Sequence, residues 1–417
     1  MSVLNSLLLN VFLALQILLF LVSIINFSIW FFSLYFRLEK KVYVKPAGQR
    51  LNPEPVSILI PIYKERRNSI LTTTKGVAAQ SYPQDKLEVV FIIEADDSLI
   101  WTELQPSLEY LRNMNVSHRV FKSKGNLKFK AGALNAALDS VNSPVIGVYD
   151  ADDTIPRIQV EEAVMLIEEG YDAVAVRVYR FRKTILGALL NLDTYLWYNI
   201  FVPFYKVVGK SVPFSGEGLF VRKEVLDKIG GFPEVLTEDS YLSLILTEEG
   251  FKTALLDSEV EELAPKDLKN NIKQRLRWNR GYVQCLSKLI RAKIPIKEKL
   301  PLLLAYGAPL TCGFSVVMSL LYIFFDGPGL FVLTDLIAPW LRAFLSIFNS
   351  KFLLSTSMSY IVGFAFMYLV ASLIVRKRLR QLTPYILLLP IYWIYLGFVA
   401  LGTPFVSTKK WLKTERR

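Results

Sequence analysis

The stretch VIGVYDADD at residues 145–153 passes directly from an apolar run into three carboxylates. The run at 145–149 is typical of a buried strand, and Asp150, Asp152 and Asp153 follow it at once. Carboxylates this close together repel one another and raise each other's pKa. They therefore either lie solvated in a loop or hold a positive group between them.

Two further strand-like runs, at 56–60 and 87–93, are followed by polar clusters in the same way. Helical periods separate the runs, at 70–80, 104–114 and 131–139. Strands that alternate with helices predict an α/β fold with a mostly parallel sheet. Such folds bind ligands at the carboxyl ends of their strands, which is where the polar clusters fall.

The chain is apolar at both ends and polar in the middle. Hydrophobic residues make up 52% of the 417 residues, and they concentrate at 7–36, 300–325, 352–375 and 382–406. Each segment is near or above the ~20 residues that a helix needs to cross a bilayer. Arg37, Lys40 and Lys41 follow the first segment, and cytoplasmic flanks carry the excess of basic residues. We therefore predict a multi-pass protein of the plasma membrane with a cytoplasmic middle.

These segments divide the chain into five parts. We predict a transmembrane helix over 1–36, a cytoplasmic α/β domain over 37–266, amphipathic interface helices over 267–299, transmembrane helices over 300–406 and a basic tail over 407–417. The C-terminal part also has a weaker apolar segment at 330–348, which contains Asp335 and Arg342. Charges inside a span are costly, so the count of C-terminal apolar segments stays open at three or four.

The charge and the rare residue types limit the kinds of partner and site. With 49 basic and 37 acidic residues, the formal net charge is +12. That excess favours anionic lipid headgroups or an anionic substrate. No nucleic-acid-binding motif accompanies it, so we predict no nucleic-acid partner. The two cysteines and the single histidine, Cys285, Cys312 and His118, lack metal-site spacing. A bound metal would therefore be held by carboxylates.

Asp150 and Asp152 stand two residues apart after a strand, where a turn can aim both side chains at one point. A hard divalent cation with oxygen ligands, Mg²⁺ or Mn²⁺, would hold them together and bridge to a diphosphate. The alternative is an Asp-rich turn that caps the next helix.

Thr237, Glu238 and Asp239 form a second acidic motif, directly before an apolar helix. One interpretation is a helix N-cap, with the acids favoured by the helix dipole. The other is a general base, because a carboxylate within reach of a hydroxyl can take its proton.

Gln274, Arg277 and Trp278 form a third motif and share one face of a predicted helix. A guanidinium suits a phosphate group in a forked geometry, and the indole offers a flat face to a sugar ring or a carbon chain. The alternative is an interfacial tryptophan with basic neighbours.

In this order, and ahead of apolar segments, the motifs Asp-x-Asp, Thr-Glu-Asp and Gln-x-x-Arg-Trp resemble those of the membrane-integrated family 2 glycosyltransferases. That family includes the synthases of cellulose, hyaluronan, chitin and mannan. The resemblance runs from about residue 56 to residue 278. It implies a GT-A-type domain, a nucleotide-sugar donor, a divalent metal and inversion at the anomeric carbon.

The resemblance also implies a donor side. Asp150 resembles the acid beside the donor diphosphate, Asp152 the metal ligand, and Lys130 the lysine that contacts the nucleotide; an exposed lysine at a helix start is the alternative for Lys130. The expected donor-binding residues are Lys130, Asp150, Pro61, Tyr63, Glu65, Glu94 and Asp96. Since a carboxylate can accept hydrogen bonds from either uracil or guanine, UDP and GDP both stay open.

On the acceptor side, Asp239 resembles the base that deprotonates the acceptor hydroxyl. The residues expected to bind the diphosphate and the acceptor are Gln274, Arg277, Trp278, Glu238, Gly216 and Glu217. For the loop at 214–218 the alternative is a plain glycine turn. The tail resembles a segment that closes over the donor phosphates, through Lys409, Trp411 and Lys413; a membrane-anchoring tail is the alternative.

Together with the motifs, the resemblance thus implies an inverting, metal-dependent membrane glycosyltransferase that adds hexoses processively to a growing polysaccharide. Its expected partners are a UDP-sugar or GDP-mannose, a glycan or lipid-linked acceptor, and the lipid bilayer. One alternative is a single addition to a polyprenyl phosphate or glycolipid, and another is an inactive scaffold that only binds a nucleotide sugar. A transporter is disfavoured, because the ionisable clusters lie in the polar middle rather than in the spans.

Overall fold

The computed structural model describes residues 28–48, 53–94, 97–123, 129–326 and 382–407, together with Leu21 and Ile25. The chain divides into two compact units, Leu38–Gly307 with Phe405–Arg417, and Met1–Arg37 with Ala308–Pro404. The first unit carries the sheet and every predicted site residue that the structure describes.

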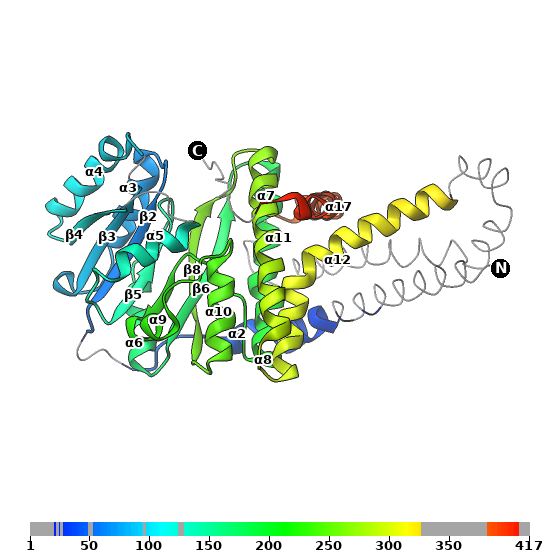
Figure 1. The fold of residues 1–417 in the computed structure, drawn as a ribbon, viewed down its shortest axis with the longest axis horizontal. Coiled ribbons are helices and arrows are strands. Elements are labelled where there is room, and N and C mark those ends of the chain that lie inside the picture. The colour runs from blue at the N-terminus through cyan, green and yellow to red at the C-terminus, as the bar shows by residue number, and fades with distance from the viewer. Residues whose placement is uncertain are drawn as a thin grey trace. The chain divides into compact units, whose positions relative to one another are not determined.

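This unit is built on an eight-stranded sheet with the order β1-β8-β6-β7-β5-β2-β3-β4 (Figure 1). The strands are β1 Tyr43–Val44, β2 Val56–Ile62, β3 Leu87–Ile93, β4 Ser117–Lys122, β5 Val145–Val148, β6 Ala173–Phe181, β7 Leu219–Arg222 and β8 Thr253–Leu263. Among these strands β7 runs antiparallel to β5 and β6, and the other neighbours pair in parallel. The prediction of a mostly parallel α/β sheet is confirmed.

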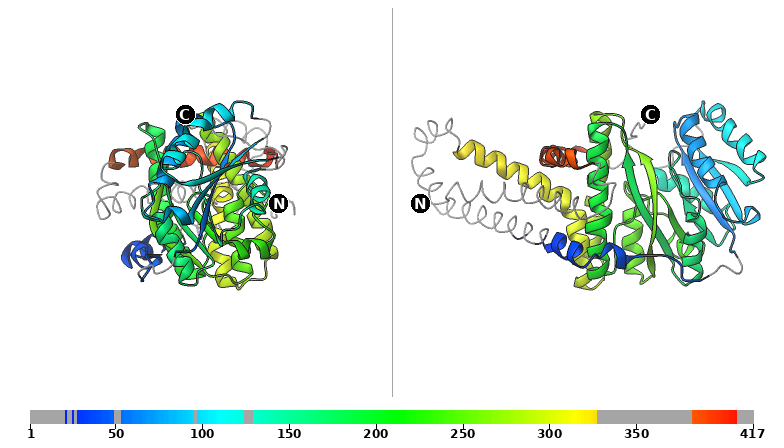
Figure 2. Two further views of the ribbon diagram at one scale, coloured as in Figure 1. Left: turned by 90° about the vertical axis from the view of Figure 1, so that its left-hand side faces the viewer. Right: turned by 180° about the vertical axis from the view of Figure 1, so that it is seen from behind.

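Helices connect the strands and pack against the sheet (Figures 1 and 2). They are α2 Glu39–Val42, α3 Arg67–Ala78, α4 Ile100–Asn113, α5 Phe129–Leu138, α6 Gln159–Glu168, α7 Ile185–Leu196, α8 Val202–Gly209, α9 Lys223–Ile229, α10 Glu238–Glu248 and α11 Leu268–Arg291. A π-helical turn, η2 Trp197–Phe201, joins α7 to α8, and a short 3₁₀ turn, η1 Gln84–Lys86, precedes β3. The predicted run at 87–93 coincides with β3, whereas α3, α4 and α5 each begin a few residues before the helical periods that predicted them.

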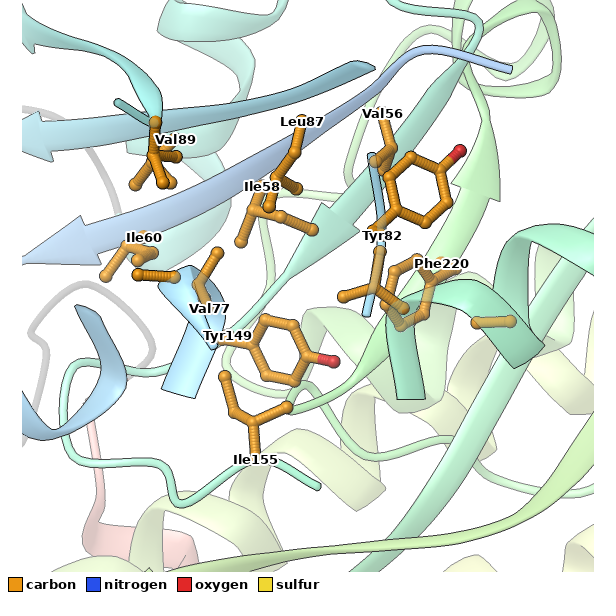
Figure 3. Packing of buried hydrophobic residues seen from close by; sticks show 14 of the residues in the cluster. Val56, Ile58, Ile60, Val77, Tyr82, Leu87, Val89, Tyr149, Ile155 and Phe220 are labelled. Carbon is orange, nitrogen blue, oxygen red and sulfur yellow. The ribbon is translucent and has the colours of Figure 1, made fainter. Parts of the chain in front are cut away.

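Buried aliphatic side chains explain why the central strands form (Figure 3). Strands β2, β3 and β5 are buried along nearly their whole length, as parallel strands covered by helices require. The rings of Tyr149 and Phe220 meet edge to face, with centroids 5.9 Å apart. This packing holds the end of β5 in place, so that Asp150 leaves the core at a defined position.

The predicted amphipathic segment at 267–299 contains the helix α11 and the first residues of the helix α12. Asp267 caps α11 by accepting a hydrogen bond from the Asn270 amide at 2.8 Å. The helix ends at Arg291, and α12 Ile296–Asp326 starts directly after Pro295, where proline suits a helix start. The predicted apolar segment at 382–406 contains η3 Thr383–Leu388, α17 Leu389–Leu401 and η4 Thr403–Phe405.

Of the residues described, one helical stretch is long and apolar enough to cross a membrane, Ile185–Gly209. It comprises α7, η2 and α8, and 72% of its most apolar part is buried inside the protein, which is typical of a core helix. The predicted segment at 300–325 falls within α12, while 352–375, 330–348 and most of 7–36 lie outside the described residues. The multi-pass topology therefore stays a prediction.

Candidate active site

The order of the strands brings two strand ends together at the candidate site. The chain runs from β2 through β3 to β4 in one direction and then returns to β5 on the other side of β2. Ligands of open α/β sheets bind where the strand order reverses in this way. Asp150 follows β5, and Pro61 and Tyr63 stand at the end of β2. The structure thus places these three predicted residues at one edge of the sheet.

The ends of β2 and β3 are tied together by a carboxylate that the sequence did not single out. The backbone amide of Lys64 donates to Asp97 Oδ2 at 2.8 Å. Lys64 has φ of 54°, a left-handed conformation that costs energy in a residue with a side chain. The hydrogen bond that Asp97 accepts from Lys64 therefore fixes the turn that carries Tyr63 and Glu65. Glu94 follows β3 directly, while Asp96 lies outside the described residues.

The loop that follows β5 is held in place by its third carboxylate, Asp153, and by the helix α3. Asp153 is fully buried, and its Oδ2 accepts a hydrogen bond from the Asp150 amide at 2.8 Å. Burial, and then the charge of Asp150, raise the pKa of Asp153 well above its usual range. The Thr73 hydroxyl donates to the Asp150 carbonyl at 2.9 Å. The loop is thus held by its own third acid and by α3. It does not cap α6, whose N-cap is Ile158 with no side-chain bond, so the capping alternative is wrong.

Lys130 joins four segments that are distant in the sequence. Its Nζ lies 2.6 Å from Asp150 Oδ1 and 3.8 Å from Glu238 Oε1, and it donates to the Gly216 carbonyl at 3.1 Å. Burial works against its charge, but Asp150, Glu238 and Glu217 outweigh burial and raise the pKa of Lys130. The alternative of an exposed lysine at a helix start is wrong, because only 11% of this side chain is exposed.

Thr237 is the N-cap residue of α10 but does not cap it with its hydroxyl. The hydroxyl lies 3.7 Å from the Cys285 sulfur instead. A Cβ added at Gly281 would stand 2.4 Å from this hydroxyl, so α11 passes very close to Thr237. The close approach of α11 explains why the Thr237 hydroxyl does not cap the helix, whereas Glu238 and Asp239 do lie in its first turn, as the N-cap interpretation expects.

Glu238 and Asp239 begin α10 and face the Lys130 side of the site. The Ser240 amide donates to Asp239 Oδ1 at 2.7 Å. Burial raises the pKa of Glu238 to about 7, although Lys130 lowers it. Burial also raises the pKa of Asp239, against the Ser240 bond and Lys130. Both groups are therefore closer to the pKa of a useful general base than an exposed carboxylate would be.

Gly216 provides the space that these groups share. A Cβ at this position would stand 3.1 Å from Lys130 Nζ, and 3.5 Å from both Asp239 Oδ2 and Glu238 Oε1. The loop before Gly216 is held by the Tyr198 phenol, which is hydrogen bonded to the Ser215 hydroxyl. Tyr198 belongs to the π-helical turn η2, and such turns are frequent at functional sites.

The Gln-x-x-Arg-Trp motif lies on α11 against the same region. Arg277 Nη1 donates to the Leu236 carbonyl at 3.2 Å, in the loop before α10. Gln274 is fully buried, and within the described residues neither its amide nitrogen nor its oxygen has a hydrogen-bond partner. The Gln274 amide is therefore available to form hydrogen bonds with a polar group of a ligand. The Trp278 ring has the guanidinium groups of Arg180 and Arg275 over it.

Asp150 also belongs to a group of three carboxylates, called the acidic cluster below. Oxygens of Asp150, Glu217 and Glu262 lie within 4.8 Å of one another. An all-oxygen set of this kind fits a hard divalent cation such as Mg²⁺ or Mn²⁺. Asp152, the predicted metal ligand, is buried but is not one of the three. Glu262 was not predicted; it is the penultimate residue of β8, and its only local signal is the Glu261-Glu262 pair there.

The acidic cluster leads to a prediction about pH. Burial, followed by Glu262 and Asp150, raises the pKa of Glu217 to about 8 from 4.5. In the metal-free protein this raised pKa contributes stability that is full below pH 4.5 and lost as pH rises through about 8. Glu217→Gln should therefore flatten the fall in stability between these values, by up to about 1.4 kcal/mol per pH unit. Thermal unfolding in EDTA measures this, and equal slopes for both proteins would contradict it.

The comparison with known families decides what this site belongs to. The model described as "Glycosyl transferase family group 2" matches residues 145–403, and "Glycosyl transferase family 2" matches residues 57–230. The first match covers more than half of the 417 residues. The chain belongs to the family 2 glycosyltransferases. The resemblance seen in the three motifs is confirmed, and the protein is a glycosyltransferase.

Curated relatives of this glycosyltransferase include a probable glycosyltransferase, YdaM, of Bacillus subtilis (strain 168). It is 26% identical over 264 residues, which cover 58% of this chain and 59% of that protein. A cellulose synthase catalytic subunit (UDP-forming) of Xanthomonas axonopodis pv. citri (strain 306) is 26% identical over 267 residues, or 61% of this chain and 35% of that protein. The chain thus matches about three fifths and one third of these relatives' own lengths.

A solved structure shares the fold of the glycosyltransferase. The mannosyltransferase PcManGT from Pyrobaculum calidifontis, in complex with GDP-Man and Mn²⁺, superposes with a TM-score of 0.56 at 21% sequence identity. The match covers 93% of this chain and 99% of that one. Together with the mixed, mostly parallel sheet, it supports the predicted GT-A fold.

Proposed function

We propose that the glycosyltransferase transfers a hexose from a UDP-sugar or GDP-mannose to a growing polysaccharide. Transfer inverts the anomeric centre, depends on Mg²⁺ or Mn²⁺, and is processive. The observation that carries the proposal is the meeting of Lys130, Glu238 and Asp239 around Gly216. There a cation suited to a diphosphate stands next to a carboxylate suited to an acceptor hydroxyl.

On the donor side, the chain's own cations receive the leaving diphosphate. Lys130 lies beside Asp150, and Arg277 bonds to the loop before α10. Fixed positive charges that meet developing negative charge lower the barrier, because they need no reorganisation during the reaction. A divalent cation, when bound, supplies further charge neutralisation, and the carboxylates of Asp150, Glu217, Glu262 and Asp152 are the candidates to hold it.

On the acceptor side, Asp239 is the proposed base. Its Oδ1 accepts a hydrogen bond from the Ser240 amide, and its Oδ2 faces the space at Gly216. As the acceptor oxygen bonds to the anomeric carbon, Asp239 takes the hydroxyl proton, and the bond from that carbon to the diphosphate oxygen breaks. The electron pair leaves with the diphosphate. Gln274, buried without a described partner, supplies a polar contact to the diphosphate or to the acceptor sugar.

The decisive experiment offers purified protein in detergent three donors separately, UDP-glucose, UDP-N-acetylglucosamine and GDP-mannose, with Mn²⁺ or Mg²⁺. The names of the relatives justify this choice, since one is UDP-forming and another holds GDP-Man. A polymer from one donor would support the proposal. One sugar added to a lipid would replace it with the single-addition reaction, and no turnover with any donor would leave only nucleotide-sugar binding.

Gly216→Ala tests the shared space at the centre of the site. The new methyl would stand 3.1 Å from Lys130 Nζ, so the flexible lysine must shift by a few tenths of an ångström. We expect kcat to fall by about 10-fold, because small misplacements at a reacting centre are costly, with little change in the melting temperature. Gly307→Ala is the control, since a Cβ there meets nothing within 4 Å. Equal activity for both variants would contradict the assignment of this space to the reaction.

A further inference from the structure

A buried arginine that the sequence did not single out lies between the acidic cluster and Trp278. Arg180 is near the end of β6, and the parallel register of β6 with β8 pairs it with Glu262. The two strands lie side by side in Figure 1. The Arg180 guanidinium forms an ion pair with the Glu262 carboxylate, and both residues are buried, with exposures of 6% and 2%. The sheet itself therefore fixes this pair.

The same guanidinium also contacts the predicted acceptor tryptophan. Its central carbon lies 4.5 Å from the centroid of the Trp278 ring. Arg275, paired with Asp193, lies over the same ring at 4.9 Å. A cation over an indole is attracted to it, most strongly where water is excluded. Trp278 is thus held by two guanidinium groups, each of which has its own carboxylate.

Glu262 connects this contact to the donor side. Its carboxylate oxygen lies within 4.8 Å of those of Asp150 and Glu217. Arg180 therefore contacts the Trp278 ring on one side and is ion-paired with Glu262, a member of the acidic cluster, on the other. A guanidinium is suited to this double contact, because it is planar and can stack on a ring while its edge binds a carboxylate. A lysine in its place would keep the charge but not the stacking.

We propose that Arg180 is a positioning residue of the transfer reaction, which holds Trp278 at a fixed place relative to the acidic cluster. This inference rests on the proposed function, with Asp150 on the donor side, and on the predicted contact of Trp278 with the acceptor. An acceptor hydroxyl must reach the anomeric carbon in a narrow geometry. Water, which needs no such alignment, reacts with the donor without this help. Loss of Arg180 should therefore impair transfer to the acceptor more than donor hydrolysis.

The test compares transfer with hydrolysis in Arg180→Lys. We expect transfer to fall by about 10-fold, through kcat and the acceptor KM, while donor hydrolysis and Mn²⁺ affinity change by less than about 3-fold. Mn²⁺ affinity, followed by electron paramagnetic resonance, reports on the site independently of activity. If Arg180→Lys does not fold, Arg180→Gln keeps a hydrogen-bond donor for Glu262 and leaves that carboxylate in place, and the same fall in the transfer-to-hydrolysis ratio is expected.

Arg177 is a matched control on the same strand. It is also buried, also paired with a carboxylate, Asp257, and its guanidinium lies 4.4 Å from the centroid of the Tyr43 ring. Within the part of the chain that the structure describes, its guanidinium contacts Asp257 and Tyr43 rather than Trp278 or the acidic cluster. Arg177→Lys should lower the melting temperature about as much as Arg180→Lys, with an unchanged transfer-to-hydrolysis ratio. If the transfer-to-hydrolysis ratio is the same in Arg180→Lys as in Arg177→Lys, the proposed role of Arg180 is wrong. A wild-type protein without transfer or hydrolysis would overturn the proposed function, and this inference with it.

Discussion

Asp239→Asn is expected to lower the rate of sugar transfer by about 10²- to 10⁴-fold, while donor affinity changes little. Asparagine has nearly the same shape and can still accept the hydrogen bond from the Ser240 amide, which measures 2.7 Å in the structure. It cannot accept the proton of an attacking hydroxyl, so only the basic function is removed. Initial rates of transfer and calorimetric titration with the nucleotide sugar separate the two effects.

Two further variants make the Asp239 result interpretable. Asp227→Asn is the control for charge alone, because Asp227 pairs with Lys223 at 2.9 Å on the exposed helix α9, and exposed pairs contribute only about 0–1 kcal/mol. Glu238→Gln tests the neighbouring acid, whose pKa is raised to about 7 by burial. If Glu238→Gln loses more activity than Asp239→Asn, then Glu238 is the base and the assignment of Asp239 is wrong.

Features that follow from local pattern were predictable from the sequence. The run at 87–93 is strand β3, since apolar residues flanked by polar ones leave few other choices. The positions of Asp150 and Asp239, after β5 and at the start of α10, followed from the same reasoning. Parallel sheets collect strand ends at one edge, so the polar groups that follow β2, β3 and β5 were expected at that edge without knowledge of any contact.

Contacts set by register or by close helix packing were not predictable. Arg180 and Glu262 are 82 residues apart, and they pair because β6 and β8 run in parallel with an irregularity between Ala175 and Arg177. Nothing near either residue in the sequence signals that pairing. Thr237 looked like a helix cap, but its hydroxyl turns to Cys285 because α11 approaches at Gly281. Tertiary contacts thus override local preferences at the positions where the site is assembled.

Lys130→Met is expected to weaken donor binding by about 10- to 100-fold, since hydrogen bonds to charged groups contribute about 1.5–3 kcal/mol. Methionine keeps the length of the side chain and loses the charge that lies 2.6 Å from Asp150. Donor affinity is measured by titration calorimetry with UDP-glucose or GDP-mannose, whichever the wild type turns over. Lys223→Met is the control, because Lys223 forms its ion pair with Asp227 at the surface.

In Lys130→Met we also expect a change in the pH dependence of the transfer rate. Lys130 lowers the pKa of both Glu238 and Asp239, so its removal should raise both. A base with a higher pKa stays protonated to a higher pH, and the acid limb of the transfer rate should therefore move upward. Lys130→Arg keeps the positive charge and should leave that limb near its wild-type position, even if donor affinity falls. A limb that does not move in Lys130→Met would mean that the group titrating in the reaction is not one that Lys130 faces, which excludes both acids of α10 as the base.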